Sequence, residues 1–425
     1  MKILENFMSK KLLILGANPE TIPLIKRVNE RGLFSYVMGK EKYAPAMGIA
    51  KFSILGDASN IKLVKTIIKK YKIDGILLGT VDVLLPAYEQ VCRELKLPCY
   101  ANKKAVKYLS SKKNFSSLCR KFKFDQVSDY TSYIKNNKEL PKKFFPVLIK
   151  PIDSGGGVGA KVCHSNSEIT QAVKNALKKS KKKNFICQKY FLEDDIQLYY
   201  TIIRGKIYLS CVVDRTTNKN QENKSPVCIG ANYKSKYLNL IIDKYNKKFQ
   251  KMVNFLKLNN GVLSIQCFVK NKKLYPYDPG LRLQGEGQHL VLNKINGFNH
   301  LDMLINLSLG KTFFSGNFNK LNDPFLKNKF ICSVWILLKK GVIKNVINLE
   351  KIKKHKCYLD VLQRFKINDK IKSEFLATEK QVFARIYLSS NKKKELINSI
   401  NYIHKNLKIL DKNGNNLILD KFKLL

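Results

Sequence analysis

A strand, a glycine-rich turn and a second strand follow one another between Val147 and Cys163. The apolar run from Val147 ends in Lys150, and residues 154–159 read Ser-Gly-Gly-Gly-Val-Gly. Glycines let backbone N–H groups approach an anion without interference from a Cβ atom, and a lysine supplies a point charge for phosphate. The turn joins strand to strand and lacks a Gly-Lys-Ser/Thr ending, so it is neither a P-loop nor a dinucleotide fingerprint. A glycine-rich hairpin that is simply a turn is the alternative.

A second segment with chemistry follows much later in the chain. Residues Gly261–Val269 alternate as a strand does, which places Gln266 on a defined face. After a short turn the chain returns, and the returning strand carries Asp278, Arg282 and Glu286 near its end. Polar groups at a strand end can converge on a ligand, so these side chains are candidates for a binding site.

Together the two segments resemble the ATP-grasp superfamily, nearest to biotin-carboxylase-like and carbamoyl-phosphate-synthase-large-chain-like ligases and to a subgroup of bacterial surface-polysaccharide loci. In that superfamily a strand lysine and a glycine-rich loop cover the triphosphate, and a late strand pair carries metal-binding acids and a substrate-binding arginine. The resemblance implies an α/β fold (α+β overall) with an N-terminal open parallel sheet, a central ATP-grasp fold with a small lid, and a small C-terminal sheet domain. It implies ATP and Mg²⁺ as cofactors.

The resemblance extends to three further motifs. Ser111-Lys112 resembles the start of a helix whose lysine reaches ATP, residues 188–191 resemble the hinge that holds adenine, and Asp195 takes the place of a glutamate near the ribose. The implied nucleotide-binding residues are Lys112, Lys150, Ser154, Gly155, Gly156, Gly157, Gly159, Gln188, Lys189, Tyr190, Phe191 and Asp195. Lys112, Lys150 and Lys189 would neutralise phosphate or bind the nucleotide. Asp278 and Glu286 would hold the metal, and Arg282 would be the catalytic arginine.

Two positions depart from the superfamily pattern. Gln266 stands where most members have an acidic metal ligand, and Gly280 stands where they have an asparagine. Magnesium is usually held by one or two carboxylates together with substrate phosphates, so Asp278 with ATP oxygens is expected to hold one ion, with Glu286 assisting. The expected function is an ADP-forming carboxylate–amine ligase that makes an acyl phosphate, with a place in surface-polysaccharide biosynthesis. An ATP-binding protein with little or no catalysis, acting as a regulatory or assembly partner, is the alternative that Gln266 and Gly280 support.

The chain of 425 residues is too long for one ordinary core, and three domains are expected. The first, 1–103, shows alternating strand and helix patterns. The ATP-grasp domain is expected at 104–320, with its lid at about 115–185, and a small β-rich domain at 321–425. Residues 214–237 are polar and predict a loop. Residues 214–217 follow a strand, and they either face a substrate or belong to a solvated loop.

The net charge of +47 is the signature expected of a nucleic-acid or polyanion binder. The lysines run through the whole chain, however, and no recognised nucleic-acid module is present, so specific nucleic-acid binding is not expected and a basic binding module is the second alternative. Ten scattered cysteines without a CxxC pair indicate reduced thiols and a cytoplasmic protein. No apolar stretch reaches the length of about 18 residues that a membrane span requires. The expected partners are small-molecule carboxylate and amine substrates, and a homodimer is the expected assembly.

Overall fold

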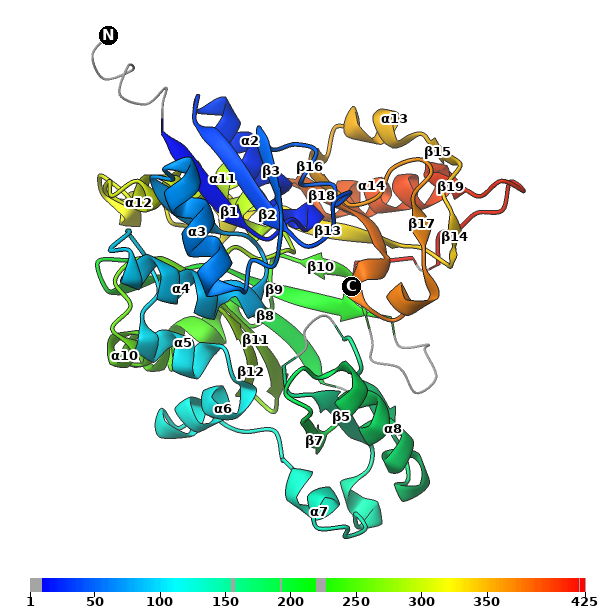
Figure 1. Cartoon of the computed structure of the whole chain (residues 1–425). Coiled ribbons are helices and arrows are strands. Elements are labelled where there is room, and N and C mark those ends of the chain that lie inside the picture. Colours follow the sequence, from blue (N-terminus) through cyan, green and yellow to red (C-terminus); the bar gives the residue numbers. More distant parts are fainter. Residues whose placement is uncertain (1–9, 154–156, 192, 219–226, 420, 425) are drawn as a thin grey trace.

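The structure is a computed structural model that describes residues 10–153, 157–191, 193–218, 227–419 and 421–424. Figure 1 shows a body formed by both ends of the chain and the central sheet, from which a smaller lobe projects. Ser154, Gly155 and Gly156, three predicted phosphate-loop residues, lie outside the described residues.

The N-terminal part is a four-stranded parallel sheet of order β3-β2-β1-β4. Its elements are β1 Lys11–Leu15, η1 Pro19–Thr21, α2 Ile22–Glu30, β2 Phe34–Gly39, β3 Phe52–Leu55, α3 Ile61–Tyr71, β4 Gly75–Leu78, η2 Asp82–Leu84 and α4 Leu85–Glu94. The predicted open parallel sheet is confirmed. Strand β3 was not predicted, because it is an edge strand whose side chains are mostly exposed and show no buried alternation.

Two helices lead to the projecting lobe, or lid. They are α5 Lys103–Leu109 and α6 Lys112–Lys121, and α6 begins at Ser111, whose hydroxyl accepts from the Asn114 N–H. The lid contains α7 Thr131–Lys135, η3 Lys142–Phe144, β5 Val147–Pro151, β6 Lys161–Cys163, α8 Asn166–Lys179 and β7 Phe185–Lys189. Its sheet of order β6-β5-β7 encloses a hydrophobic cluster of its own. The predicted strand–turn–strand unit is therefore present as β5 and β6.

An eight-stranded sheet of order β12-β11-β8-β9-β10-β13-β18-β16 forms the floor beneath the lid. Its first five strands in chain order are β8 Asp194–Ile203, β9 Lys206–Thr217, β10 Cys228–Asn232, β11 Gly261–Lys270 and β12 Lys273–Gly280. The predicted loop at 214–237 is wrong at 214–217 and 228–232, because β9 extends to Thr217 and β10 pairs with it on the central sheet. Arg215, Thr216 and Thr217 at the end of β9 line the cleft described below, which explains why this strand end lacks an apolar pattern.

Helices cover the sheet and lead into the C-terminal part. They are α9 Leu238–Leu240, the π-helical turn η4 Ile241–Tyr245, α10 Asn246–Leu256, α11 Gln288–Asn296, α12 His300–Ser308, η5 Phe318–Lys320 and η6 Leu326–Asn328. The C-terminal elements are β13 Phe330–Leu337, β14 Gly341–Val342, β15 Asn345–Ile347, α13 Leu349–Lys353, β16 Tyr358–Gln363, β17 Lys370–Ile371, η7 Ser373–Phe375, η8 Glu379–Gln381, β18 Val382–Ser390, α14 Lys393–Asn406 and β19 Lys408–Leu410. Strands β13, β18 and β16 extend the central sheet, and β14 with β17 and β15 with β19 form two short antiparallel pairs.

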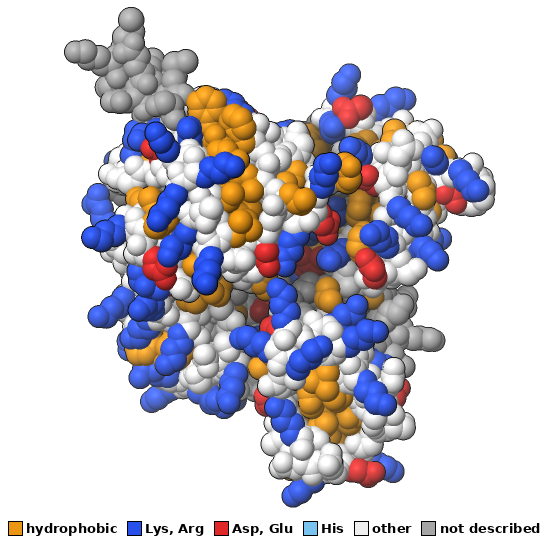
Figure 2. All heavy atoms as spheres, in the orientation of Figure 1, with side chains coloured by type: hydrophobic (Ala, Val, Ile, Leu, Met, Phe, Trp, Pro, Cys, Tyr) orange, Lys and Arg blue, Asp and Glu red, His pale blue; other side chains and the backbone are white. Residues whose placement is uncertain are grey.

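The distribution of surface charge and the length of the helices are relevant to the predictions on nucleic acid and membranes. Figure 2 shows lysine and arginine side chains spread over the visible face rather than gathered in one stripe. Among the described residues, no helix is both long and apolar enough to cross a membrane.

Candidate active site

A cleft of about 500 Å³ lies where the lid, the central sheet and both terminal parts of the chain meet. Figure 2 shows this hollow between the lid and the body. Its lining includes Asn18, Glu20, Thr80 and Asp82 from the N-terminal part, Lys150 and residues 188–191 from the lid, Arg215, Asp278, Arg282 and Glu286 from the central region, and Arg364 and Glu379 from the C-terminal part. We call the side under the lid the nucleotide end and the side between the terminal parts the acceptor end.

Two lysines and one carboxylate meet at the nucleotide end. Lys150 lies on β5 of the lid and Lys112 begins α6, and the ammonium of Lys112 is 3.6 Å from a carboxylate oxygen of Asp278. Burial and the neighbouring Lys112 lower the pKa of Lys150 to about 8, and Asp278 opposes this shift. Two cations that repel one another at a half-buried site are stabilised by a bound polyanion.

A row of aromatic rings supports this end of the cleft. Phe191 of the hinge stacks on Phe268 at 5.4 Å between ring centroids, and Phe268 stacks on Tyr277 at 4.4 Å. The Lys150 ammonium lies 5.9 Å from the centre of the Tyr277 ring. The hinge thus packs directly on the central sheet, and its apolar faces can contact a flat base.

The structure places the predicted hinge at the lid–sheet junction. Gln188 and Lys189 end β7, and Tyr190 and Phe191 follow it along the cleft wall. The Lys189 ammonium, however, donates to the carbonyl oxygens of Phe144 and Phe145 at 3.1 and 2.7 Å. The Lys189 ammonium is thus directed into the lid backbone, and a role of Lys189 in binding the nucleotide stays a prediction.

The two described glycines of the phosphate loop have different structural roles, one at the cleft and one in packing within the lid. Gly157 has φ of +79° and lines the cleft, together with Val158. Gly159 has φ of +76°, and a Cβ atom there would come within 2.9 Å of both Pro151 and Lys179. Gly159 therefore allows the close approach of α8 to β5, whereas Gly157 is placed to present backbone to a ligand.

A buried charge network forms the wall between the two ends. Arg215 on β9 lies opposite Asp195 on β8 and donates to its carboxylate at 2.5 Å. Its other terminal nitrogen is 3.0 Å from Glu286, and Tyr277 donates to the second oxygen of Asp195 at 2.9 Å. Burial raises the pKa values of Asp195 and Glu286, and Arg215 opposes both shifts. Both oxygens of Asp195, the predicted ribose ligand, are thus engaged by protein groups.

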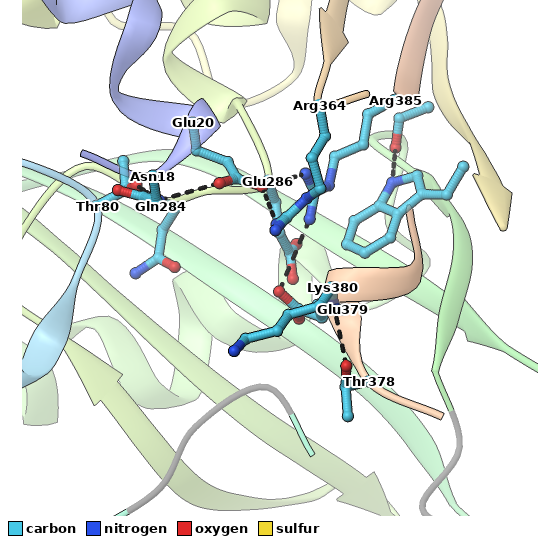
Figure 3. Close-up of polar contacts among 12 residues, drawn as sticks. Asn18, Glu20, Thr80, Gln284, Glu286, Arg364, Thr378, Glu379, Lys380 and Arg385 are labelled. Carbon is cyan, nitrogen blue, oxygen red and sulfur yellow. Dashed lines mark hydrogen bonds and ion pairs between the residues drawn. The ribbon is translucent and has the colours of Figure 1, made fainter. Parts of the chain in front are cut away.

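The acceptor end contains a second buried network, shown in Figure 3. Glu20 from the N-terminal part accepts from Arg364 and, at 3.1 Å, from Arg385 of the C-terminal part. Burial opposes ionisation of Glu20, but Arg364 and Arg385 outweigh it and lower its pKa to about 2. Arg385 also lies over the Trp335 ring, 4.3 Å from its centroid. Opposite ends of the chain are therefore joined at the cleft by ionised groups.

Arg282 faces the acceptor end and is itself paired. Its guanidinium makes two hydrogen bonds with the carboxylate of Asp82, of which the one from Nε measures 2.6 Å, and it donates to the Leu283 carbonyl at 2.7 Å. Burial opposes the charged form of Arg282, but Asp82 raises its pKa. The predicted catalytic arginine is thus held charged and oriented at the cleft wall.

The predicted metal ligands are placed differently from each other. Asp278 borders the cleft opposite Gln266 in the strand register, whereas Glu286 is buried and engaged by Arg215 and Gln288. Among the described residues, no group of three or more acids, histidines or cysteines could hold a metal ion. One carboxylate and one amide oxygen at the nucleotide end fit a magnesium ion that arrives with phosphate oxygens, not one held by the protein alone.

Sequence analysis did not find three charged residues of this cleft: Glu20, Arg364 and Glu379. It did place Arg215 in a segment, residues 214–217, that could face a substrate, and Arg215 does line the cleft. Glu379 lies 3.8 Å from Arg215 and 3.7 Å from Arg385, so it links the two networks. Glu20 lies in the short helical turn η1, where charged side chains are usual. No local pattern marks such residues, because their partners come from distant parts of the chain.

Comparison with known proteins matches this architecture. Residues 112–205 match the sequence family described as "Carbamoyl-phosphate synthase L chain, ATP binding domain". The chain has the fold of the ATP-grasp proteins. The matched residues run from Lys112 through the lid to β8, which are the elements that form the nucleotide end.

Curated relatives and solved structures agree with the assignment. A formate-dependent phosphoribosylglycinamide formyltransferase of Prochlorococcus marinus subsp. pastoris is 25% identical over 319 residues, covering 71% of this chain and 78% of that protein. An L-amino acid ligase from Bacillus licheniformis superposes with a TM-score of 0.76 at 15% identity, covering 95% of this chain and 99% of the other. The biotin carboxylase domain of Hydrogenobacter thermophilus 2-oxoglutarate carboxylase, in complex with MgADP and bicarbonate, has a TM-score of 0.74 at 14% identity, covering 94% of this chain and 90% of the other. The predicted ATP-grasp fold and the general class, an ATP-dependent ligase, are confirmed.

Proposed function

We propose that this ATP-grasp protein is an ADP-forming ligase that activates a small carboxylate as an acyl phosphate and joins it to an amine. The observation that carries the proposal is the continuity of the cleft, which runs from Lys112 and Lys150 at one end to Arg282 at the other. A phosphoryl donor and a carboxylate bound at these two ends would meet inside one cavity.

The nucleotide end supplies charge for a triphosphate. Lys112 and Lys150 are the cations at the lid–sheet junction, and Gly157 presents backbone beside them. Asp278, with the amide of Gln266 beside it, would hold magnesium that arrives with ATP, and the ion would neutralise charge on the phosphate oxygens. MgADP in the Hydrogenobacter structure supports these two cofactors.

The reaction divides into two transfers. A carboxylate oxygen of the substrate attacks the γ-phosphorus, the bond from that phosphorus to the ADP oxygen breaks, and ADP leaves with the electron pair. The amine nitrogen then attacks the acyl carbon, inorganic phosphate leaves, and the nitrogen loses a proton. Lys150 and Arg282 would stabilise the negative charge that develops on the phosphoryl and carboxylate oxygens during the first transfer.

The biological setting of the reaction stays a prediction. A place in surface-polysaccharide biosynthesis is proposed from the resemblance alone. The three-domain division at residues 103 and 320 is likewise proposed. The non-catalytic and polyanion-binding alternatives receive no support from the dispersed surface lysines in Figure 2 or from the continuous cleft.

Trapping of the acyl phosphate tests the proposal. With ATP, magnesium and a panel of amino acids, sugar acids and small peptides, hydroxylamine should yield a hydroxamate together with ADP and phosphate. Arg282→Ala should abolish hydroxamate formation while ATP still binds, because this arginine is assigned to the carboxylate and the transition state. Asp278→Asn should also lose turnover.

One control variant and two possible results complete the test of the acyl-phosphate reaction. Lys182→Ala, at an exposed position of the lid, should leave turnover unchanged. AMP and pyrophosphate as products would show adenylation and refute the acyl-phosphate reaction. No carboxylate-stimulated ADP release across the panel would favour an ATP-binding protein without ligase activity.

A further inference from the structure

Asp82 binds the guanidinium of Arg282 in the way that a substrate carboxylate would. Its two oxygens bind Nε and one terminal nitrogen of the guanidinium, which is the bidentate arrangement that arginine makes with carboxylates. Asp82 comes from η2, directly after β4, and 200 residues separate it from its partner. About half of the Asp82 side chain is exposed, at 49%, whereas that of Arg282 is 11% exposed.

The space that the Asp82 carboxylate fills exists because residue 280 is glycine. A Cβ atom on Gly280 would lie 3.3 Å from Oδ1 of Asp82 and 3.0 Å from Oγ of Ser264, and it would also meet the amide of Gln284. Any larger side chain would therefore push against the carboxylate and the amide that border Arg282. The absence of a side chain at Gly280 and the approach of Asp82 to Arg282 are thus parts of one arrangement.

The neighbouring carboxylate cannot take over the position of Asp82. Glu20 is committed to Arg364 and Arg385, and its second oxygen accepts from Asn18 at 2.9 Å. Among the described residues, Arg282 is the cation that forms an ion pair with Asp82. A ligand that displaces Asp82 from Arg282 therefore leaves one carboxylate at the acceptor end without its countercharge.

Substrates differ in whether they replace that countercharge. A simple carboxylate exchanges one ion pair with Arg282 for another and leaves Asp82 unpaired. A carboxylate that carries a cationic amine offers Asp82 a new partner at the same time, so both ion pairs are satisfied after the exchange. We propose that Asp82 is a specificity-determining residue, which yields Arg282 to the substrate carboxylate and accepts the substrate ammonium, so that the activated substrate is an amino acid. This inference rests on the proposed function, which assigns Arg282 to the carboxylate.

Binding of matched acids tests the inference without turnover. Calorimetry with magnesium and a non-hydrolysable ATP analogue would compare L-alanine with propionate and L-glutamate with glutarate, pairs that differ by the amine. Wild type should bind at least one amino acid more tightly than its matched acid. Asp82→Asn should shift the ratio of the two dissociation constants at least tenfold toward the acid without the amine, because the variant can neither compete for Arg282 as an anion nor attract the ammonium.

Two further variants separate this role from a structural one. Gly280→Ala should shift the ratio in the same direction, since its methyl group would press on the Asp82 carboxylate. Glu94 lies at the end of α4, the helix that follows Asp82, and its surface carboxylate pairs with Lys65 of α3. Glu94→Gln removes this carboxylate and should leave the ratio unchanged. An unchanged ratio in Asp82→Asn, or binding of no amino acid by wild type, would overturn the inference. Amino acid binding without ADP formation would instead refute the ligase reaction and leave the role of Asp82 standing.

Discussion

The nucleotide end and the acceptor end of the cleft are lined by charged residues that are used in opposite ways. At the nucleotide end, Lys150 has no carboxylate within ion-pair distance among the described residues, and its lowered pKa reflects burial beside another lysine. At the acceptor end, Arg364 and Arg385 share Glu20, across 344 and 365 residues of sequence. At the first end Lys150 offers its positive charge to an incoming anion, whereas the second end uses paired charge to join distant parts of the chain.

This contrast shows that the role of a charged residue in the cleft, in ligand binding or in stability, depends on whether it already has an oppositely charged partner. A cation without a nearby carboxylate gains a partner when a ligand binds, so its removal should weaken binding and spare the fold. A cation paired with a buried carboxylate already has its partner, so removal of either should damage the fold first. The predictions below test this division.

Glu20→Gln should have the largest effect, on stability. Loss of the charge leaves Arg364 and Arg385 buried beside a neutral amide, and breaking a buried ion pair costs about 3–5 kcal/mol. Urea unfolding should show this decrease in the free energy of unfolding, with ATP affinity changed less than about twofold. Glu94→Gln, at an exposed pair, should change the free energy of unfolding far less than Glu20→Gln does. A stable Glu20→Gln protein with impaired ATP binding would contradict this distinction between ligand-binding and structural charges.

Acid should remove the same stabilisation from wild type. The pKa of Glu20 is depressed in the folded protein to about 2, from 4.5. Its contribution is therefore fully present above pH of about 4.5 and is lost as the pH falls toward 2. The difference in unfolding free energy between wild type and Glu20→Gln should shrink over this range. A difference that stays constant with pH would contradict ionised pairing of Glu20.

Lys150→Ala should have the next largest effect, on nucleotide affinity. A charge-assisted hydrogen bond contributes about 1.5–3 kcal/mol, so ATP should bind roughly 10- to 150-fold more weakly. The melting temperature should hardly change, because Lys150 neutralises no buried carboxylate. Calorimetry measures the affinity, and Lys182→Ala is the matched control. Unchanged ATP affinity in Lys150→Ala would remove this lysine from the nucleotide site.

The pH dependence of ATP binding sharpens the same assignment. Since the pKa of Lys150 is lowered to about 8, the free protein loses this positive charge as the pH rises past that value. ATP affinity should then fall by up to about 1.4 kcal/mol per pH unit. Lys150→Arg keeps its charge in this range and should show a flatter profile. Equal profiles for wild type and Lys150→Arg would exclude Lys150 as the titrating group.

The two ends also differ in how far the sequence reveals them. Lys112, Lys150, Gly157 and the hinge occur in short local patterns of strand, turn and helix, and such patterns can be recognised in one sequence. Glu20 and Arg364 have no such pattern, because their pairing depends on how the fold brings η1 next to the residue that directly follows β16. The parallel N-terminal sheet was predictable from its alternating apolar segments, whereas the exposed edge strand β3 was not.

Local patterns also leave some positions undetermined. Lys189 follows a glutamine in a hinge-like motif, but its ammonium contacts the carbonyls of Phe144 and Phe145, which a sequence does not place. Arg215 lies in a polar segment that predicts a loop, because the end of its strand borders a charged cleft and lacks an apolar alternation. A strand that borders a polar site is thus hard to distinguish from a loop by composition.

The continuous eight-stranded sheet limits how this chain can be divided. Strand β10 pairs on one side with β9 and on the other with β13, so the boundary expected near residue 320 passes between hydrogen-bonded neighbours. A chain ended at residue 320 would carry an unprotected strand edge at β10 and would lose Arg364, Glu379 and Arg385 at once. The C-terminal quarter, residues 321–425, thus shares one sheet with the central region, so we do not expect it to fold apart from that region. Recombination with a related protein would have to exchange it together with the segment that carries Glu20.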